Sequence, residues 1–369
     1  MTTTKKKQSG IYITRREEAP WYRNWAVRLI AIALALVLCG LLTTLLVGEN
    51  PIQVYASMIA GAFGTARKTW ITLQETAMLL CVALALAPAF RMRFWNLGGE
   101  GQILAGGLVS ALCMILLGGK MPNALLIILT AVASILAGAV WGVIPAVCKA
   151  KWNTNETLFT LMMNYVATQL VAFFVIIFES PRGSGKIGII NQKTQAGWLP
   201  QIGSNRYLLN ILIVVLVAVL MHIYLNYSKH GYELTVVGES QSTARYVGIK
   251  VGKTIIRTMF LSGALCGLAG LLLVAGTNHT ITTTIAGGRG FTAVLVAWLA
   301  KFSPAGMILS SLLLVFMEQG AGEISTTFAL NQSFGDILTG IILFFIIGSE
   351  FFITYRVHFR GGRKEKEND

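Results

Sequence analysis

The sequence FWNLGGEGQ, at residues 94–102, is the stretch that decides the fold. It places an amide, a carboxylate and a second amide (Asn96, Glu100 and Gln102) among three glycines, between two apolar runs. Polar groups at membrane depth are costly and persist where they face protein or a water-filled path. Adjacent glycines allow a helix to break, and non-helical backbone inside a membrane is tolerated where it lines a cavity. The stretch therefore predicts a broken helix at a functional site.

The composition predicts an all-α polytopic membrane protein. Of its 369 residues, 54% are hydrophobic and 12% are charged, against about 25% charged in soluble domains. Apolar runs of spanning length predict about ten transmembrane helices, some short or broken. The predicted spans are Trp25–Val47, Thr76–Phe90, Gly98–Leu117, Asn123–Cys148, Thr157–Phe178, Tyr207–Leu225, Ile255–Gly276, Gly290–Ala300, Ala305–Phe316 and Ile337–Phe352. The short eighth and ninth spans are either tilted or, in one case, re-entrant, and Glu318 and Gln319 are expected to close the ninth before an outer loop.

The basic residues predict the orientation. With a cytoplasmic N-terminus, 22 of the 30 lysines and arginines lie inside, as the positive-inside rule requires. Both termini are then cytoplasmic, as tails of residues 1–24 and 355–369 around a transmembrane domain of residues 25–354. The net charge of +14 follows from this topology and requires no nucleic-acid partner. The first span lacks a small-residue cleavage site, so we interpret it as an anchor.

A polar stripe runs along the predicted fifth span, in NETLFTLMMNY at residues 155–165. Asn155 and Glu156 stand where a helix is capped, and Thr160 and Asn164 follow at helical spacing. Such a stripe either forms hydrogen bonds between helices or lines a pathway. The sequence alone leaves both interpretations open.

The predicted seventh span contains a small-residue pattern, SGALCGLAG at residues 262–270. Gly263 and Gly267 form a G-x-x-x-G step, and Gly270 follows one turn later. Small residues at this spacing let two helix backbones approach closely. The pattern therefore predicts close helix packing.

The longest inner loop, residues 227–253, contains GESQSTARYVGI at residues 238–249. This segment predicts a short surface helix, capped by Ser240 or Ser242 and closed by Gly248. Such a helix is either a docking element or an ordinary interfacial connection. The overlapping GIKVGKT at residues 248–254 resembles a phosphate-binding P-loop, but it has three residues between its glycines where four are needed. We therefore expect the chain itself not to bind ATP.

These motifs together resemble a known family. FWNLGGEGQ is similar to the signature of the permease subunits of ABC importers for nucleosides and simple sugars, the group that includes ribose and branched-chain amino acid permeases. NETLFTLMMNY, GYELTVVGESQSTARYVGI, SGALCGLAG and GRGFTAVLVAWLAKFSPAG resemble further family blocks in the family's order, between about Thr72 and Gly306. The long basic N-terminal tail and large first outer loop resemble the longer permease of nucleoside-type systems. Trp298 and Lys301 depart from the pattern, which bears on substrate identity.

The resemblance implies a set of partners. The loop helix would be the coupling element that inserts into a cytoplasmic ABC ATPase, which would bind the ATP. The coupling residues are Gly238, Glu239, Ala244, Arg245 and Gly248. A second permease subunit, expected to be a different but related chain, and an extracytoplasmic substrate-binding protein or lipoprotein would complete the system in the plasma membrane of a prokaryote. No catalytic residue, metal ligand or cofactor is assigned to this chain.

Eight residues are candidates for the substrate pathway. They are Asn96, Glu100, Gln102, Asn155, Glu156, Thr160, Asn164 and Phe291. Carboxamides supply both donors and acceptors to sugar hydroxyls and base edges, and Phe291, like Trp298, can stack on a base or sugar face. The alternative for the aromatic residues is core packing, and the alternative for Glu100 is acceptance of backbone N–H groups at a broken helix.

Two other classes of function, a secondary transporter and an intramembrane enzyme, would require different sequence features. An ion-coupled secondary transporter of a small polar solute would use similar polar helix positions but needs no docking loop. An intramembrane enzyme would need a catalytic pair or metal set, and the sequence contains no H-E-x-x-H or G-x-S-x-G motif. The sequence does not specify which nucleoside or sugar is transported or whether the second permease is identical. Nor does it specify whether residues 96–102 contact the substrate or only shape the gate.

Overall fold

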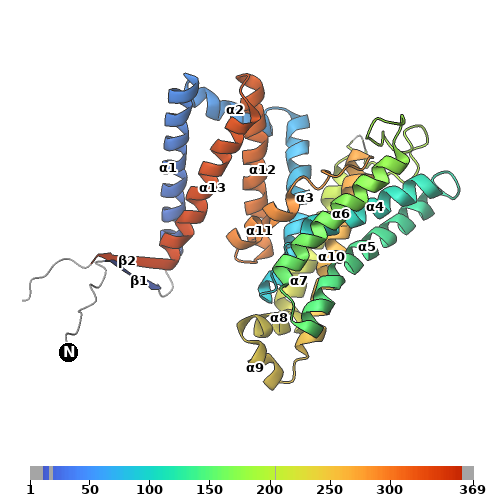
Figure 1. Ribbon diagram of the computed structural model, residues 1–369. Helices are drawn as coiled ribbons and strands as arrows, with labels where there is room; N and C mark the ends of the chain where they lie inside the picture. The colour runs from blue at the N-terminus through green and yellow to red at the C-terminus, as the bar shows by residue number, and fades with distance from the viewer. Residues whose placement is uncertain (1–10, 16–19, 204, 360–369) are drawn as a thin grey trace, which may run out of the picture. The chain divides into compact units, whose positions relative to one another are not determined.

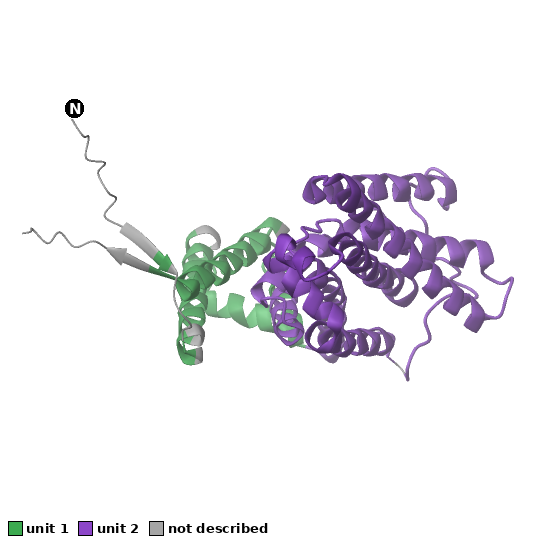
Figure 2. Cartoon of the chain, turned by 90° about the horizontal axis from the view of Figure 1, so that it is seen from below, with its two compact units in different colours: residues 1–64, 317–369 green, residues 65–316 purple. Residues whose placement is uncertain are grey.

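The computed structural model describes residues 11–15, 20–203 and 205–359 (Figure 1). Most of the predicted tails, residues 1–24 and 355–369, lies outside the described residues. The described chain is predominantly helical, which confirms the predicted all-α class for the membrane-embedded part. It divides into two compact units, residues 1–64 with 317–369 and residues 65–316 (Figure 2).

The first unit joins the two ends of the chain. Its elements are β1 (Ile11–Arg15), α1 (Trp21–Val47), α2 (Pro51–Phe63), the end of α12 (Pro304–Thr327), α13 (Gln332–Thr354) and β2 (Tyr355–Phe359). Helices α1 and α13 pack together, and Arg28 donates to Glu350 across them at 3.1 Å. Strands β1 and β2 pair antiparallel, with Ile11 opposite Phe359. The sequence analysis predicted neither this two-stranded sheet nor α2.

The second unit contains the remaining helices. They are α3 (Ala66–Arg91), α4 (Gly99–Leu117), α5 (Asn123–Trp152), α6 (Glu156–Phe178), α7 (Leu208–Tyr227), α8 (Lys229–Glu239), α9 (Gln241–Tyr246), α10 (Val251–Leu271) with its π-helical extension η1 (Leu272–Asn278), α11 (Arg289–Leu299) and the start of α12. In their most apolar windows, α3 is 89% buried and α10 with η1 is 78% buried, against 28% for α5 and α6. Helices α3 and α10 therefore form the core, and the others surround them.

Glycines bring α5 and α10 into backbone contact. A Cβ atom added to Gly138 would lie 2.3 Å from the carbonyl oxygen of Gly263, and one added to Gly267 would lie 2.4 Å from that of Ser134. Gly106 of α4 approaches the same turn, where an added Cβ would be 2.5 Å from the Cα of Gly267. The close packing predicted from the G-x-x-x-G step is confirmed.

Nine of the described helices are long and apolar enough to cross a membrane, and two shorter apolar helices, α2 and α11, accompany them. The eighth predicted span is the short α11. The predicted end of the ninth span was wrong, because α12 continues without interruption to Thr327 and includes Glu318 and Gln319. This last part of α12 packs on α2 of the same unit, where a Cβ added to Gly61 would meet the Cβ of Glu323 at 2.5 Å. Packing against α2, which the sequence analysis did not foresee, favours helix here despite the polar residues.

The loop between α6 and α7 is folded against the ends of neighbouring helices. Ile190 N–H donates to the carbonyl of His279 at 2.8 Å, and the indole N–H of Trp198 donates to Ile190 O at 2.8 Å. The rings of Trp198 and His279 stack with centroids 3.7 Å apart. Burial, with a smaller contribution from nearby Arg206, lowers the pKa of His279 from 6.5 to about 4.

We expect this loop to loosen in acid. Above pH 6.5 His279 is neutral both in the stacked loop and when the loop opens, so its contribution to stability is complete. Between pH 6.5 and about 4 the opened form binds a proton that the stacked form does not. The stability of the stacked loop therefore decreases as the pH is lowered through this range. In thermal unfolding of the purified chain, we expect the melting temperature to fall more between pH 7.5 and pH 5 in the wild type than in His279→Asn. Equal decreases in the two proteins would contradict the prediction.

Candidate functional site

The segment between α3 and α4 turns the chain back into the interior of the second unit. Helix α3 ends at Arg91, three residues after Pro88, and Arg93 adopts a left-handed φ of 58°. Residues 94–98 have no regular secondary structure, and α4 begins at Gly99 without a side-chain cap from Gly98. The backbone groups exposed by this break need partners from elsewhere, because buried unpaired N–H and C=O groups are costly.

A buried amide pair closes the first part of the break. Asn96 and Gln102 are 0% and 1% exposed. The Oδ1 atom of Asn96 accepts from the Gly98 N–H at 3.0 Å and from Gln102 Nε2 at 3.3 Å. Its Nδ2 donates to the buried hydroxyl of Ser262 on α10 at 3.1 Å. Asn96 therefore holds the start of α4 against α10.

The polar stripe on α6 supplies the remaining partners of the break. The hydroxyl of Thr160 accepts from the Leu97 N–H at 3.2 Å. Asn164 donates from Nδ2 to Leu97 O at 2.8 Å and accepts at Oδ1 from the Gly101 N–H at 2.8 Å. Both side chains are buried, and their hydrogen bonds replace those that a continuous helix would have made. The stripe thus forms interhelical hydrogen bonds, one of the two interpretations left open by the sequence.

Glu100 joins the start of α4 to the start of α11. Its two carboxylate oxygens accept from the N–H groups of Gly288 and Gly290, each at 2.9 Å. The residue preceding α11, Gly288, has no side chain with which to cap the helix, so the carboxylate satisfies N–H groups at its positive end. The helix starts touch, since a Cβ added to Gly290 would lie 2.3 Å from the Glu100 nitrogen. Beside this contact, Arg289 forms an ion pair with Glu75 of α3.

Three candidate pathway residues lie apart from this cluster. Asn155 caps α6 by accepting from the Leu158 N–H at 3.1 Å. Glu156 forms an ion pair of 2.9 Å with Lys149 at the end of α5. Phe291, on α11, is 47% exposed. The structure therefore brings together Asn96, Glu100, Gln102, Thr160 and Asn164, and it gives these three residues separate surroundings.

The sequence analysis missed part of this site. It assigned Ser262 only to a packing motif, and it did not connect Glu100 with α11 or Glu75 with Arg289. The available signal was GGRG at residues 287–290, directly before a short apolar run, which is typical of a helix start without its own cap. Trp298, which departs from the family pattern, stacks on Trp95 with ring centroids 5.4 Å apart.

The loop that follows α7 forms two helices, α8 and α9. Helix α9 is the short helix predicted within residues 238–249, and α8 precedes it. Ser240 separates them and caps α9 by accepting from the Thr243 N–H at 3.2 Å, which confirms Ser240 as a cap. Gly248, with a φ of 85°, ends the segment as predicted. Helix α8, which ends with Gly238 and Glu239, was not predicted from the sequence.

Some of the predicted coupling residues are packed against the rest of the protein, and others are exposed. Gly238 lies against the C-terminal end of α3, where an added Cβ would be 2.3 Å from the carbonyl oxygen of Arg91. Ala244 is buried, whereas Glu239 and Arg245 are exposed. The loop is thus seated on the helix that leads into the break, with two charged side chains presented outward.

A bundle of apolar helices with a hydrogen-bonded helix break in its interior is typical of membrane transport proteins. Residues 70–347 match the family described as branched-chain amino acid transport system / permease component, so the chain belongs to this family of permeases. It is similar to the guanosine ABC transporter permease protein NupP of Bacillus subtilis, with 30% identity over 92% of this chain and 97% of the relative.

Two further relatives extend this comparison. The nucleoside ABC transporter permease protein NupB of Lactococcus lactis is 29% identical over 88% of this chain and 91% of the relative. The glucose ABC transporter permease protein TsgB13 of Haloferax volcanii is 25% identical over 93% and 92%. No solved structure matches the chain. The similarity to full-length ABC permeases supports the assignment of this chain as a transport subunit.

Proposed function

We propose that this chain is the permease subunit of an ATP-driven importer of nucleosides in the plasma membrane of a prokaryote. The observation that carries the proposal is the junction of the starts of α4 and α11 through Glu100 in the interior of the second unit. Two helix starts held by one carboxylate form a contact that can open and close without unfolding either helix. The names of two relatives, which specify guanosine and nucleosides, support the substrate class.

The residues around the junction have two proposed roles. Four side chains form hydrogen bonds with the backbone of the break and with one another: Asn96, Gln102, Thr160 and Asn164. We therefore assign them the role of keeping the wall of the pathway in shape. Glu100 is the group whose contacts change during transport. Phe291, half exposed on α11, offers a ring on which a nucleobase can stack.

The proposed partners follow from the inner and outer surfaces. A cytoplasmic ABC ATPase would bind the exposed charges of the α8–α9 loop and hydrolyse ATP, a second, related permease would complete the pathway, and a substrate-binding protein or lipoprotein would dock outside. Pairing of β1 with β2 puts both terminal segments together, which supports the proposal that both termini lie on the same side of the membrane; the distribution of basic residues favours the cytoplasmic side. Alternating access is then a shift between inward-open and outward-open states.

Uptake by cells that express the complete transport system tests this function. Radiolabelled guanosine, cytidine, ribose and glucose would be offered with and without ATP depletion, and with and without an ionophore. Uptake of a nucleoside that requires ATP and survives the ionophore supports the proposal. Uptake of only sugars would favour the second candidate, a sugar importer, which the similarity to the glucose permease TsgB13 supports. Uptake that follows an ion gradient would indicate a secondary transporter.

Charge reversal in the coupling loop should uncouple transport. Arg245 is exposed on α9 and is predicted to face the ATPase. A reversed charge in a complementary interface is costly, so we expect Arg245→Glu to lower nucleoside uptake at least about tenfold while the protein still reaches the membrane. The control is Lys151→Glu, which reverses an exposed charge at the end of α5, outside the loop. Equal uptake by both variants would show that α9 does not couple.

A further inference from the structure

A basic cavity lies between α8 and the beginning of α10, apart from the junction at Glu100. Its volume is about 500 Å³, and the segment that links α9 to α10 forms part of its wall. Four of the side chains that line it are cationic and exposed: Lys229, Lys250, Lys253 and Arg257. They come from two helices and the connecting segment, so the fold brings Lys229 of α8 to the three cations of residues 250–257.

The positive charge of this cavity is not balanced within the described part of the chain. Glu233 is the one acidic residue that lines it, and its carboxylate is bound to His230 Nδ1 at 3.1 Å. Among the described residues, none forms an ion pair with any of the four cationic side chains. Four cations that face a single carboxylate leave a net positive charge, which favours an external anion.

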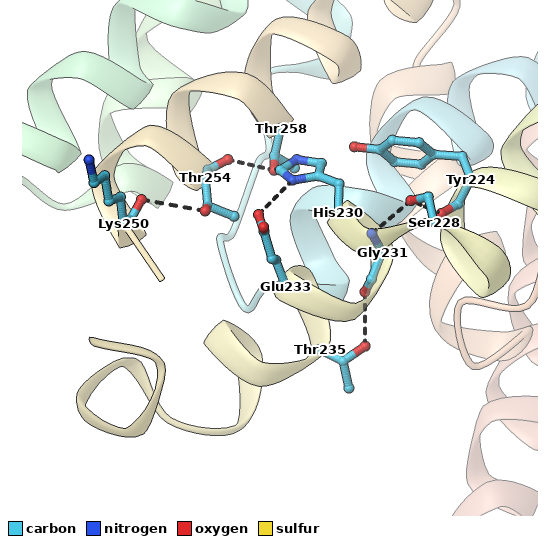
Figure 3. Close-up of polar contacts among 9 residues, drawn as sticks. All are labelled: Tyr224, Ser228, His230, Gly231, Glu233, Thr235, Lys250, Thr254 and Thr258. Carbon is cyan, nitrogen blue, oxygen red and sulfur yellow. Dashed lines mark hydrogen bonds and ion pairs between the residues drawn. The ribbon is translucent and has the colours of Figure 1, made fainter. Parts of the chain in front are cut away.

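The wall of the cavity is held in place by buried hydrogen bonds (Figure 3). His230 is 4% exposed, and its Nε2 lies 3.4 Å from the hydroxyl of Thr258 on α10. That hydroxyl also donates to Thr254 O at 2.7 Å, and the hydroxyl of Thr254 donates to Lys250 O at 3.4 Å. Helix α8 is thereby tied to α10, so the backbone positions that carry the cations are held next to one another.

The cavity stands where membrane helices end. Lys229 is two residues beyond the end of α7, and Arg257 is in the second turn of α10. Basic pockets at the cytoplasmic ends of membrane helices suit phosphate head groups, and arginine binds phosphate oxygens in a planar, bidentate manner. The positive end of the α10 dipole adds to the same field. We propose that this cavity binds a phosphate-bearing anion, supplied either by an anionic lipid head group or by a soluble phosphate.

Binding to the full-length chain, purified from membranes with the subunits that accompany it, tests the proposal. One arm measures retention of added phosphatidylglycerol, against phosphatidylcholine, by native mass spectrometry. The other arm measures binding of radiolabelled inorganic phosphate to the complex in neutral detergent. The variants are Lys253→Gln with Arg257→Gln, the charge-conserving pair Lys253→Arg with Arg257→Lys, and Arg93→Gln as an exposed basic residue outside the cavity.

We expect the neutral double variant to bind the probe about thirtyfold more weakly, since each basic side chain near an anionic surface contributes about fivefold. The charge-conserving pair and Arg93→Gln should bind like the wild type. Loss of binding in the phosphatidylglycerol arm alone identifies a lipid head group, and loss in the phosphate arm alone identifies a soluble anion. If neither probe binds, or if Arg93→Gln weakens probe binding as much as the neutral double variant does, the proposal is overturned. The basic residues of the cavity would then only reflect the membrane topology. Nucleoside uptake is not needed for this readout, so its outcome is independent of the proposed function.

Discussion

Leucine in place of Gly138 is expected to prevent the second unit from folding. A single added Cβ atom would lie 2.3 Å from the carbonyl oxygen of Gly263 and 2.6 Å from the Cα of Gly267, and both are backbone atoms of a core helix. Backbone cannot rotate away as a side chain can, so α5 and α10 would have to separate. Overpacking a core costs about 1–3 kcal/mol even for small additions, and we expect Gly138→Ala to be destabilised by that amount.

The measurement is size-exclusion profile and thermal unfolding of the purified chain. Gly138→Leu should give little or no monodisperse protein, and Gly138→Ala should give a folded protein that melts earlier than the wild type. Gly340→Leu is the matched control, because it adds the same side chain to a predicted membrane helix where no atom lies within 4 Å of the added Cβ. A monodisperse Gly138→Leu protein with wild-type thermal stability would show that α5 and α10 are not packed through this glycine.

Replacement of Glu100 by alanine is expected to abolish transport while the protein still folds. Its carboxylate accepts from the N–H groups of Gly288 and Gly290, and loss of both bonds leaves two N–H groups at the start of α11 without this partner. Each such loss costs about 1–3 kcal/mol at a buried position, which is enough to shift a conformational equilibrium by about tenfold or more. We therefore expect uptake to fall by about two orders of magnitude. Glu100→Gln retains one acceptor oxygen and should be intermediate.

The control for Glu100 is a carboxylate with the same bonding in a different place. Glu179, in the loop between α6 and α7, accepts from the N–H groups of Gly183 and Gly185 at 2.5 and 2.9 Å, and these bonds lower its pKa. Glu179→Ala should leave uptake close to the wild-type value, because the loop lies outside the junction. Uptake by Glu100→Ala equal to that of Glu179→Ala would remove the junction from the mechanism. Thermal unfolding of both variants separates a transport defect from a folding defect.

The class of the protein and most of its helices follow from local sequence. Burial in lipid requires long apolar runs, so the spans from α3 to α7 could be located from composition alone, and the glycines of SGALCGLAG indicated close packing. The end of α12 could not be found in this way, since Glu318 and Glu323 give it a polar sequence and its packing on α2 depends on a contact between distant segments. The β1–β2 pairing joins residues more than 300 positions apart and has the same cause.

In the site, too, some features follow from local sequence and others depend on contacts between distant segments. FWNLGGEGQ by itself determined that a helix breaks beside a polar cluster, because three glycines and three polar groups are too costly in a continuous membrane helix. Only the tertiary structure decided which groups satisfy that break. Asn164 reaches it from α6 and Ser262 from α10, and Glu100 extends from it to Gly288 and Gly290. Hydrogen bonds between distant segments depend on helix packing, and one sequence read without its fold does not specify that packing.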